Sequence, residues 1–318
     1  MRVGALLSIA AIWVAAVTTS AAADCVAQAP AQLSVNARPG ATSPDQAGRA
    51  IAAVYVNDQG PFRFVVDTGA NRSVLSARLA DQLGLISFGA GEVHSVTDMQ
   101  MAPLAHVRSL RFGPVDLANT ALPVIDGPML AGEQGMLGFD GMSGRRLEMD
   151  FVHHCVEILD AATAPPLSNW VMVQGQLRFS SMMVARGEIE GVRVNVLIDT
   201  GSDVSLCNHA FRTALERVRA IVVEYHGGRA YTAGRPLFFD DSIWAPRIHV
   251  GHTMISNVTA YEGDYHIFRL WNLQDKPTVL VGMDVIGPSG AMAIDYTNSQ
   301  IYFRRAPRAR PGSEPFTR

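Results

Sequence analysis

The sequence predicts a mostly β protein made of two similar lobes with a cleft between them. Three observations favour this fold: a short motif that occurs twice, a second landmark that follows each copy, and short strand-forming runs separated by glycine and proline. The chain has 318 residues, 48% of them hydrophobic, which is enough for two domains of ordinary size.

The first repeat is an apolar run that leads into Asp-Thr-Gly. The segment 64–70, FVVDTGA, in the first half corresponds to 196–202, VLIDTGS, in the second. Alternating apolar residues before each copy predict a strand, and the glycine at its end allows a tight turn. We therefore expect Asp67 and Asp199 at equivalent places in two equivalent lobes.

The second repeat is an apolar pair followed by glycine. The segment 136–140, MLGFD, recurs as 280–284, LVGMD, and each copy leads to a further aspartate, Asp150 or Asp295, at nearly the same spacing. We expect Asp150 and Asp295 to shape turns between strands. Order and spacing agree in both halves, so the chain is an internal duplication.

The repeats and the composition divide the chain into five parts. Residues 1–23 are predicted to be a signal peptide, with an apolar stretch before a run of alanines. The first lobe is expected at 24–160, a linker with two prolines at 161–168, the second lobe at 169–305, and a flexible tail at 306–318. This pattern predicts a periplasmic or secreted protein, with a retained membrane anchor as the alternative.

The paired aspartates point to acid–base chemistry. A carboxylate at the end of a buried strand is costly to ionise alone, but two facing carboxyl groups can share one proton. The ionised group then activates a water molecule while the protonated group polarises a carbonyl. The formal net charge of −3 gives no basic face, which argues against nucleic-acid binding.

These motifs resemble those of the aspartic peptidase superfamily, in its retropepsin-like branch, and the chain is similar to exported bacterial single-chain, two-lobed aspartyl proteases. The resemblance implies two retropepsin- or pepsin-like β-barrel lobes and catalytic roles for Asp67 and Asp199. It also implies two sets of supporting residues. The active-site loops contain Thr68, Gly69 and Ala70 in the first lobe and Thr200, Gly201 and Ser202 in the second, and the bracing elements are Leu137 with Gly138 and Val281 with Gly282.

The resemblance further implies the activity. We expect an aspartic-type endopeptidase that hydrolyses an extended polypeptide bound in the inter-lobe cleft, as a monomer and without a metal or organic cofactor. The alternative is an exported factor of the same fold that is catalytically silent or processes a single substrate. Contact with a membrane is expected only if the N-terminal segment is retained. Flaps over the cleft are expected near residues 92–102 and 224–234.

Two finer expectations concern the cysteines and the dyad. Cys207 aligns with Leu75 of the first repeat, so it is expected to be buried, which leaves Cys25 and Cys155 to form a disulfide. Ser202 is expected to donate a hydrogen bond to Asp199, whereas Ala70 offers Asp67 no such donor. On that basis Asp67 should hold the shared proton more often.

Overall fold

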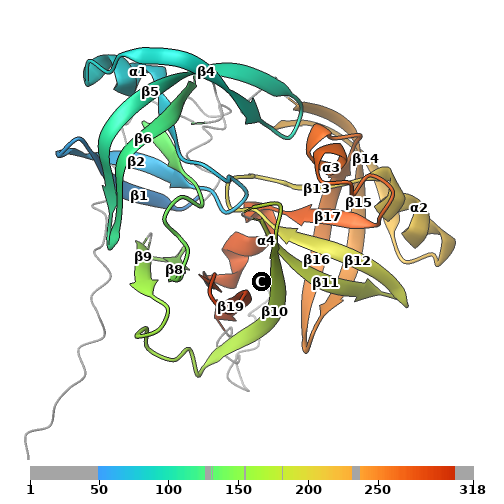
Figure 1. Ribbon diagram of the computed structural model, residues 1–318. Coiled ribbons are helices and arrows are strands. Elements are labelled where there is room, and N and C mark those ends of the chain that lie inside the picture. The colour runs from blue at the N-terminus through green and yellow to red at the C-terminus, as the bar shows by residue number, and fades with distance from the viewer. Residues whose placement is uncertain are drawn as a thin grey trace, which may run out of the picture.

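The computed structural model describes residues 49–125, 130, 132–153, 155–180, 182–230 and 237–304 of the chain (Figure 1). Most of the described residues lie in strands, as predicted. The predicted signal peptide at 1–23 and the tail at 306–318 lie outside the described residues. None of the helices within the described ranges has the length and apolar character to cross a membrane.

The first lobe is a closed barrel of six strands, which starts and ends at β1 because β5 pairs with β1. In order around the barrel the strands are β1 (Ile51–Val56), β2 (Gln59–Val66), β7 (Gly135–Leu137), β3 (Val74–Ser76), β6 (Val115–Ile125) and β5 (Met99–Phe112). β4 (Ser87–His94) pairs only with β5 and extends from the barrel as a hairpin. Helix α1 (Ala77–Gln82) begins at Ser76, whose side chain caps it.

The second lobe repeats this plan strand for strand. Its barrel runs β11 (Met182–Ile189), β12 (Val192–Ile198), β17 (Thr278–Val281), β13 (Ser205–Cys207), β16 (Thr253–Glu262) and β15 (Leu237–Val250), and β15 closes it against β11. β14 (Val222–Ala230) pairs only with β15, as β4 does with β5, and α2 (His209–Arg217) corresponds to α1. The predicted fold of two similar β-barrel lobes is therefore confirmed.

A sheet shared by the two halves joins the barrels. Its order is β10 (Trp170–Arg178), β19 (Gln300–Arg304), β18 (Ala291–Asp295), β8 (Arg145–Asp150) and β9 (Cys155–Asp160). The central pair, β18 and β8, brings one strand from each half of the chain together. The predicted linker lies between β9 and β10, so both of its ends enter this sheet.

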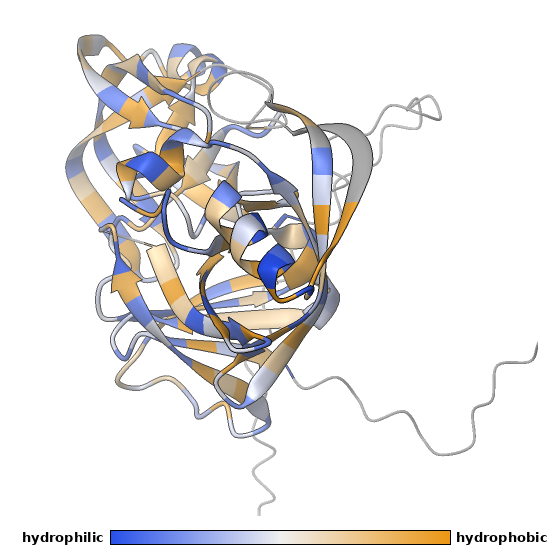
Figure 2. Ribbon diagram, turned by 90° about the vertical axis from the view of Figure 1, so that its right-hand side faces the viewer, coloured by the Kyte–Doolittle hydropathy of each residue, from blue (hydrophilic) through white to orange (hydrophobic). Residues whose placement is uncertain are grey.

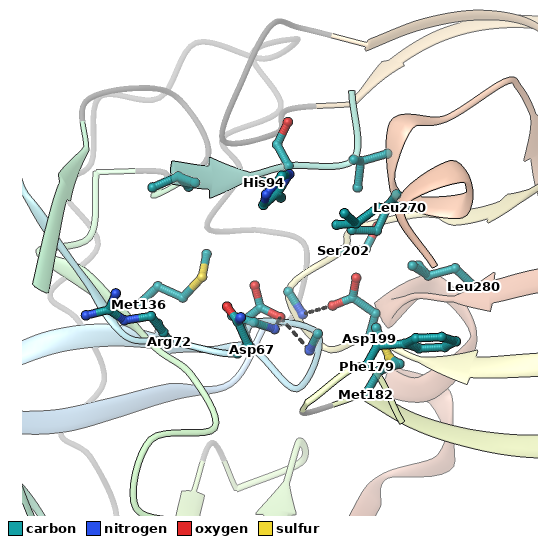
Figure 3. Close-up of a pocket in the computed structure, with 18 of the residues that line it drawn as sticks. Asp67, Arg72, His94, Met136, Phe179, Met182, Asp199, Ser202, Leu270 and Leu280 are labelled. Atoms are coloured by element: carbon teal, nitrogen blue, oxygen red, sulfur yellow. Dashed lines mark hydrogen bonds between the residues drawn. The ribbon is translucent and has the colours of Figure 1, made fainter. Parts of the chain in front are cut away.

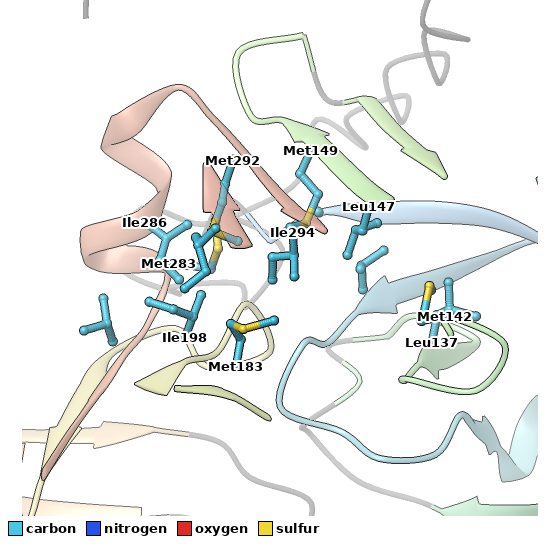
Figure 4. Packing of buried hydrophobic residues seen from close by; sticks show 14 of the residues in the cluster. Leu137, Met142, Leu147, Met149, Met183, Ile198, Met283, Ile286, Met292 and Ile294 are labelled. Atoms are coloured by element: carbon cyan, nitrogen blue, oxygen red, sulfur yellow. The ribbon is translucent and has the colours of Figure 1, made fainter. Parts of the chain in front are cut away.

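Apolar side chains from both halves meet above the shared sheet. Leu147 and Met149 of β8 lie beside Met292 and Ile294 of β18, and α4 (Met283–Ile286) covers them from the second lobe (Figure 4). Along the strands, buried and exposed residues alternate, as the hydropathy colouring of the barrels illustrates (Figure 2). One core therefore runs through both lobes and supports the loops above it.

Candidate active site

The two Asp-Thr-Gly turns meet where the barrels face each other. Asp67 follows β2 and Asp199 follows β12, and the two carboxyl groups face each other, Asp199 buried and Asp67 partly buried (Figure 3). The structure thus brings together two residues that are far apart in the sequence. Two carboxyl groups this close cannot both ionise easily, so they titrate as a pair.

The turns supply backbone amides to these carboxyl groups. The amides of Gly69 and Ala70 donate to Asp67 Oδ1 at 2.7 and 3.0 Å. The amide of Gly201 donates to Asp199 Oδ1 at 2.9 Å. These bonds fix each carboxyl group in the plane of its own turn and stabilise its charged form.

Each glycine also makes room for the opposite carboxyl group. A Cβ atom on Gly201 would lie 2.3 Å from Asp67 Cγ, and one on Gly69 would lie 2.9 Å from Asp199 Cγ. Both distances are shorter than non-bonded carbon atoms tolerate. Only glycine at these two positions lets the carboxyl groups approach each other.

The threonines lock the two turns together. The Thr68 amide donates to Thr200 Oγ1 at 3.2 Å, and the Thr200 amide donates to Thr68 Oγ1 at 3.1 Å. Each hydroxyl then donates to the opposite strand, from Thr68 to the Ile198 carbonyl at 2.9 Å and from Thr200 to the Val66 carbonyl at 2.7 Å. Four buried hydrogen bonds therefore cross between the lobes at the base of the dyad.

The predicted bracing elements lie directly behind the turns. The Asp67 amide donates to the Leu137 carbonyl and the Asp199 amide to the Val281 carbonyl, both at 3.0 Å. These bonds continue the parallel pairing of β2 with β7 and of β12 with β17. The position of each aspartate is thus set by the neighbouring strand as well as by its own.

Glycine in the bracing elements allows two backbones to touch. A Cβ atom on Gly138 would lie 2.6 Å from the Arg72 carbonyl oxygen, and one on Gly282 would lie 2.6 Å from the Val204 carbonyl oxygen. The same contact occurs at the same place in each lobe. This close packing explains why the apolar pair is followed by glycine in both repeats.

A cavity of about 210 Å³ lies above the dyad and is lined by both lobes. On the Asp199 side its wall is apolar, with Leu206, Leu280 and the stacked pair Phe179 and Trp271. On the Asp67 side it is more polar and includes Asn71, Arg72 and Glu92. The space therefore offers different surroundings on the two sides of a bound molecule.

The predicted first-lobe flap roofs this cavity. The β4–β5 hairpin places Val93, His94, Ser95 and Val96 over the dyad (Figure 3). The predicted second flap belongs to the β14–β15 hairpin, whose tip at 231–236 lies outside the described residues.

Comparison with known families agrees with this geometry. Residues 52–140, which include β2 to β7 and the first Asp-Thr-Gly turn, match the family model described as aspartyl protease. The first lobe is similar to an aspartyl protease domain. The resemblance of the chain to the aspartic peptidase superfamily is thereby confirmed. No curated protein matches the chain.

The hydrogen bond expected from the Ser202 hydroxyl to Asp199 is absent, although the Ser202 backbone amide does donate to Asp199. The Ser202 hydroxyl has one proton, and it donates that proton to the Val204 carbonyl at 2.7 Å. The serine hydroxyl therefore stabilises its own loop and does not donate to the Asp199 carboxyl group. A serine after the glycine can serve either acceptor, and the sequence does not show which one it reaches.

The pKa directions favour a different location for the shared proton from the expected one. Burial raises the pKa of both aspartates, and it raises that of Asp199 further because Asp67 lies beside it. Two backbone amides oppose the rise at each aspartate, and at Asp67 the contact with Asp199 and the charge of Arg49 oppose it as well. These directions favour Asp199 as the protonated member and Asp67 as the ionised one.

Arg49 was not predicted as part of the candidate site. It precedes β1 in the first lobe, and its side chain is 6% exposed and lies 3.4 Å from Asp203, which follows the second Asp-Thr-Gly turn. The pair links the lobes beside the dyad. The sequence holds no signal for this contact, because an arginine before a strand and an aspartate after a turn are both common on surfaces.

The described residues also account for two of the cysteines. Cys207 is fully buried in β13 without a disulfide, at the position equivalent to Leu75 of β3. Cys155 is buried in β9 and belongs to a disulfide. Cys25 lies outside the described residues, so its pairing with Cys155 stays a prediction. Within the described ranges, no group of three or more potential ligands could hold a metal ion.

Proposed function

We propose that the protein is an exported aspartic endopeptidase whose catalytic pair is Asp67 and Asp199. One observation carries the proposal: the two carboxyl groups face each other on interlocked turns, each against the glycine of the opposite turn, at the floor of a cavity that both lobes line. Family membership supports hydrolysis of peptide bonds in general. The roles of the individual residues rest on the geometry.

In the proposed reaction the two carboxyl groups act in opposite senses. Ionised Asp67 accepts a proton from a water molecule as the water oxygen attacks the peptide carbonyl carbon, and protonated Asp199 gives its proton to the carbonyl oxygen. Asp67 then returns its proton to the amide nitrogen as the carbon–nitrogen bond breaks. As the bond breaks, one hydroxyl group of the tetrahedral intermediate gives its proton to ionised Asp199 and re-forms the carbonyl, so the pair again holds one proton.

The cavity supports an extended peptide as substrate. The space lies between the turns below and the flap above, so a strand-like chain can pass through it with its backbone against both. The apolar wall on the Asp199 side favours an apolar side chain next to the cleaved bond. We further propose that residues 1–23 direct export to the periplasm or beyond, and that the monomer is active because one chain supplies both aspartates.

The test uses the purified mature chain and a library of unmodified peptides. Asp67→Asn and Asp199→Asn should each lower kcat/KM by at least about a thousandfold, since each removes one half of the proton exchange. Asp116→Asn, which changes an exposed carboxylate on β6, should leave kcat/KM unchanged.

Two controls sharpen this test. Circular dichroism should show that all three variants keep the fold. An active-site-directed inhibitor of aspartic proteases should block the wild type. Peptides that bind tightly but are never cleaved would overturn the proposal and favour the silent, peptide-binding alternative.

A further inference from the structure

The tip of the first-lobe flap touches the second lobe through a pair of histidines. His94 ends β4, and His266 begins α3 (His266–Leu270). His94 Nδ1 lies 3.0 Å from His266 Nε2, and the rings stack with centroids 5.3 Å apart and planes 9° from parallel. One ring donates this hydrogen bond and the other accepts it. The pair joins residues from different lobes directly above the active site.

A second contact lies beside the histidines. Val96 of the flap packs against a buried cluster of the second lobe that includes Ile267 and Phe268. The Ile267 amide donates to the Val96 carbonyl at 3.4 Å. This amide is in the first turn of α3, where no carbonyl of the helix itself can accept it. The flap therefore supplies a partner that α3 lacks, and the structure shows the flap closed.

The two contacts hold the roof of the cavity in place. His94 and Val96 line the cavity from above, and Ile267 and Leu270 line it from the side of α3 (Figure 3). Opening of these contacts would widen the way in for a substrate, and their closing would hold the substrate against the dyad.

We propose that His94 and His266 are positioning residues that keep the flap closed over the dyad for as long as at least one of the two rings is neutral. This inference rests on the proposed function. The pair does not touch the reacting atoms and acts through the position of the flap.

The hydrogen bond between the rings sets this condition. A neutral pair has one donor and one acceptor at the contact, and a singly protonated pair still has both. A doubly protonated pair has two donors, no acceptor and two positive charges in contact. The first proton is therefore tolerated, whereas the second breaks the bond and opens the flap.

Charged groups lie on both sides of the pair. Glu92 Oε2 lies 3.5 Å from His94 Nε2, on the side of the ring away from His266. Burial lowers the pKa of His266, and His94 and Arg269 lower it further, while Asp98 opposes them. Arg269 itself is paired with Asp264 at 2.6 Å. His266 therefore takes a proton only at a more acid pH than an ordinary histidine.

The experiment compares pH profiles of kcat/KM for the wild type and His266→Gln. Glutamine keeps an acceptor oxygen that never takes a proton in this range. At pH values below that at which the histidine pair binds its second proton, wild-type kcat/KM should fall about tenfold per pH unit. His266→Gln should lack this fall until the dyad itself becomes fully protonated. His94→Gln should behave in the same way, and His252→Gln, on an exposed turn after β15, should follow the wild type.

A second measurement works without cleavage. In Asp67→Asn, hydrogen exchange of the Ile267 amide, corrected for intrinsic rate, should be faster at about pH 5 than at about pH 7, because the Val96 carbonyl leaves when the flap opens. Adding His266→Gln should remove that difference.

The outcomes separate the two proposals. An absence of cleavage by the wild type refutes the proposed function, and the exchange data still test the flap. The histidine proposal is overturned if kcat/KM falls at the same acid pH in all variants and hydrogen exchange of the Ile267 amide does not depend on pH. The glutamine variants could also lose activity equally at every pH, with the acid side of the kcat/KM profile at the same pH as in the wild type. That result would likewise overturn the histidine proposal, because it would mean that the histidines only support the local structure.

Discussion

The interlocked threonines allow a quantitative test of how the lobes hold the dyad. In Thr200→Val, a methyl group replaces a fully buried hydroxyl that donates to the Val66 carbonyl and accepts from the Thr68 amide. Valine keeps the shape of the side chain but offers neither bond. Each lost bond costs about 1–2 kcal/mol when its partner stays buried, so the free energy of unfolding should fall by about 2–4 kcal/mol.

A matched control exists within the second lobe. The Thr278 hydroxyl is equally buried, donates to the Lys276 carbonyl and accepts from the Asn195 side chain. Thr278→Val therefore removes the same number of hydrogen bonds without touching the junction of the lobes. Its unfolding free energy should fall by less, because the Lys276 and Asn195 groups that lose their partner are only partly buried, and only Thr200→Val should also lower kcat/KM, because only its bonds position the aspartates.

Urea unfolding followed by circular dichroism gives the stability change, and peptide cleavage under folding conditions gives the activity. Thr200→Ser should restore both, since serine keeps the hydroxyl. The reasoning fails if the free energy of unfolding of Thr200→Val falls by less than about 0.5 kcal/mol, which is the range of ordinary surface substitutions. It also fails if the two valine variants have the same kcat/KM.

Further predictions concern the glycine, the buried charge and the assembly. Gly201→Ala should abolish cleavage while the chain still folds, because its Cβ atom would meet the Asp67 carboxyl group, whereas Gly287→Ala, whose nearest neighbour would be 3.5 Å away, should be fully active. Asp199 has a raised pKa in the folded state, so its contribution to stability is present below the unfolded value near 3.8 and is lost as the pH rises through the folded value. Asp199→Asn should therefore raise the urea midpoint at neutral pH and change it little at about pH 3; an unchanged midpoint at neutral pH would contradict the raised pKa of Asp199. Specific activity should stay constant on dilution, and a loss that tracks dissociation in light scattering would show that the monomer is inactive.

The parts of the site that the sequence predicted are those that repeat. Asp67 and Asp199, with the threonine and glycine after each, stand in a local pattern that occurs twice, so one copy indicates the place of the other. The geometry of the turn follows from such a pattern because its hydrogen bonds join residues two or three apart, or equivalent residues of the two copies.

The parts that the sequence did not predict are single contacts between distant residues. Arg49 with Asp203 and His94 with His266 each join one lobe to the other, and neither pair has a counterpart in a repeat. The proton was assigned to Asp67 because one hydroxyl was expected to face the dyad. A rotation about a single bond of Ser202 sends it to another acceptor, and no sequence pattern records that choice.

The sheet shared by the two halves has a consequence for how this molecule can evolve. In a symmetric dimer of identical chains every substitution occurs twice, and a change that helps one half is imposed on the other. Here β8 and β18 come from different halves of one chain, so each half is free to vary by itself while the shared sheet keeps them aligned. His94 of the first-lobe flap can then meet His266 of the second lobe without the repeat imposing the same contact on the other half. A single chain can therefore place different residues at equivalent positions of its two lobes, which two identical subunits cannot do.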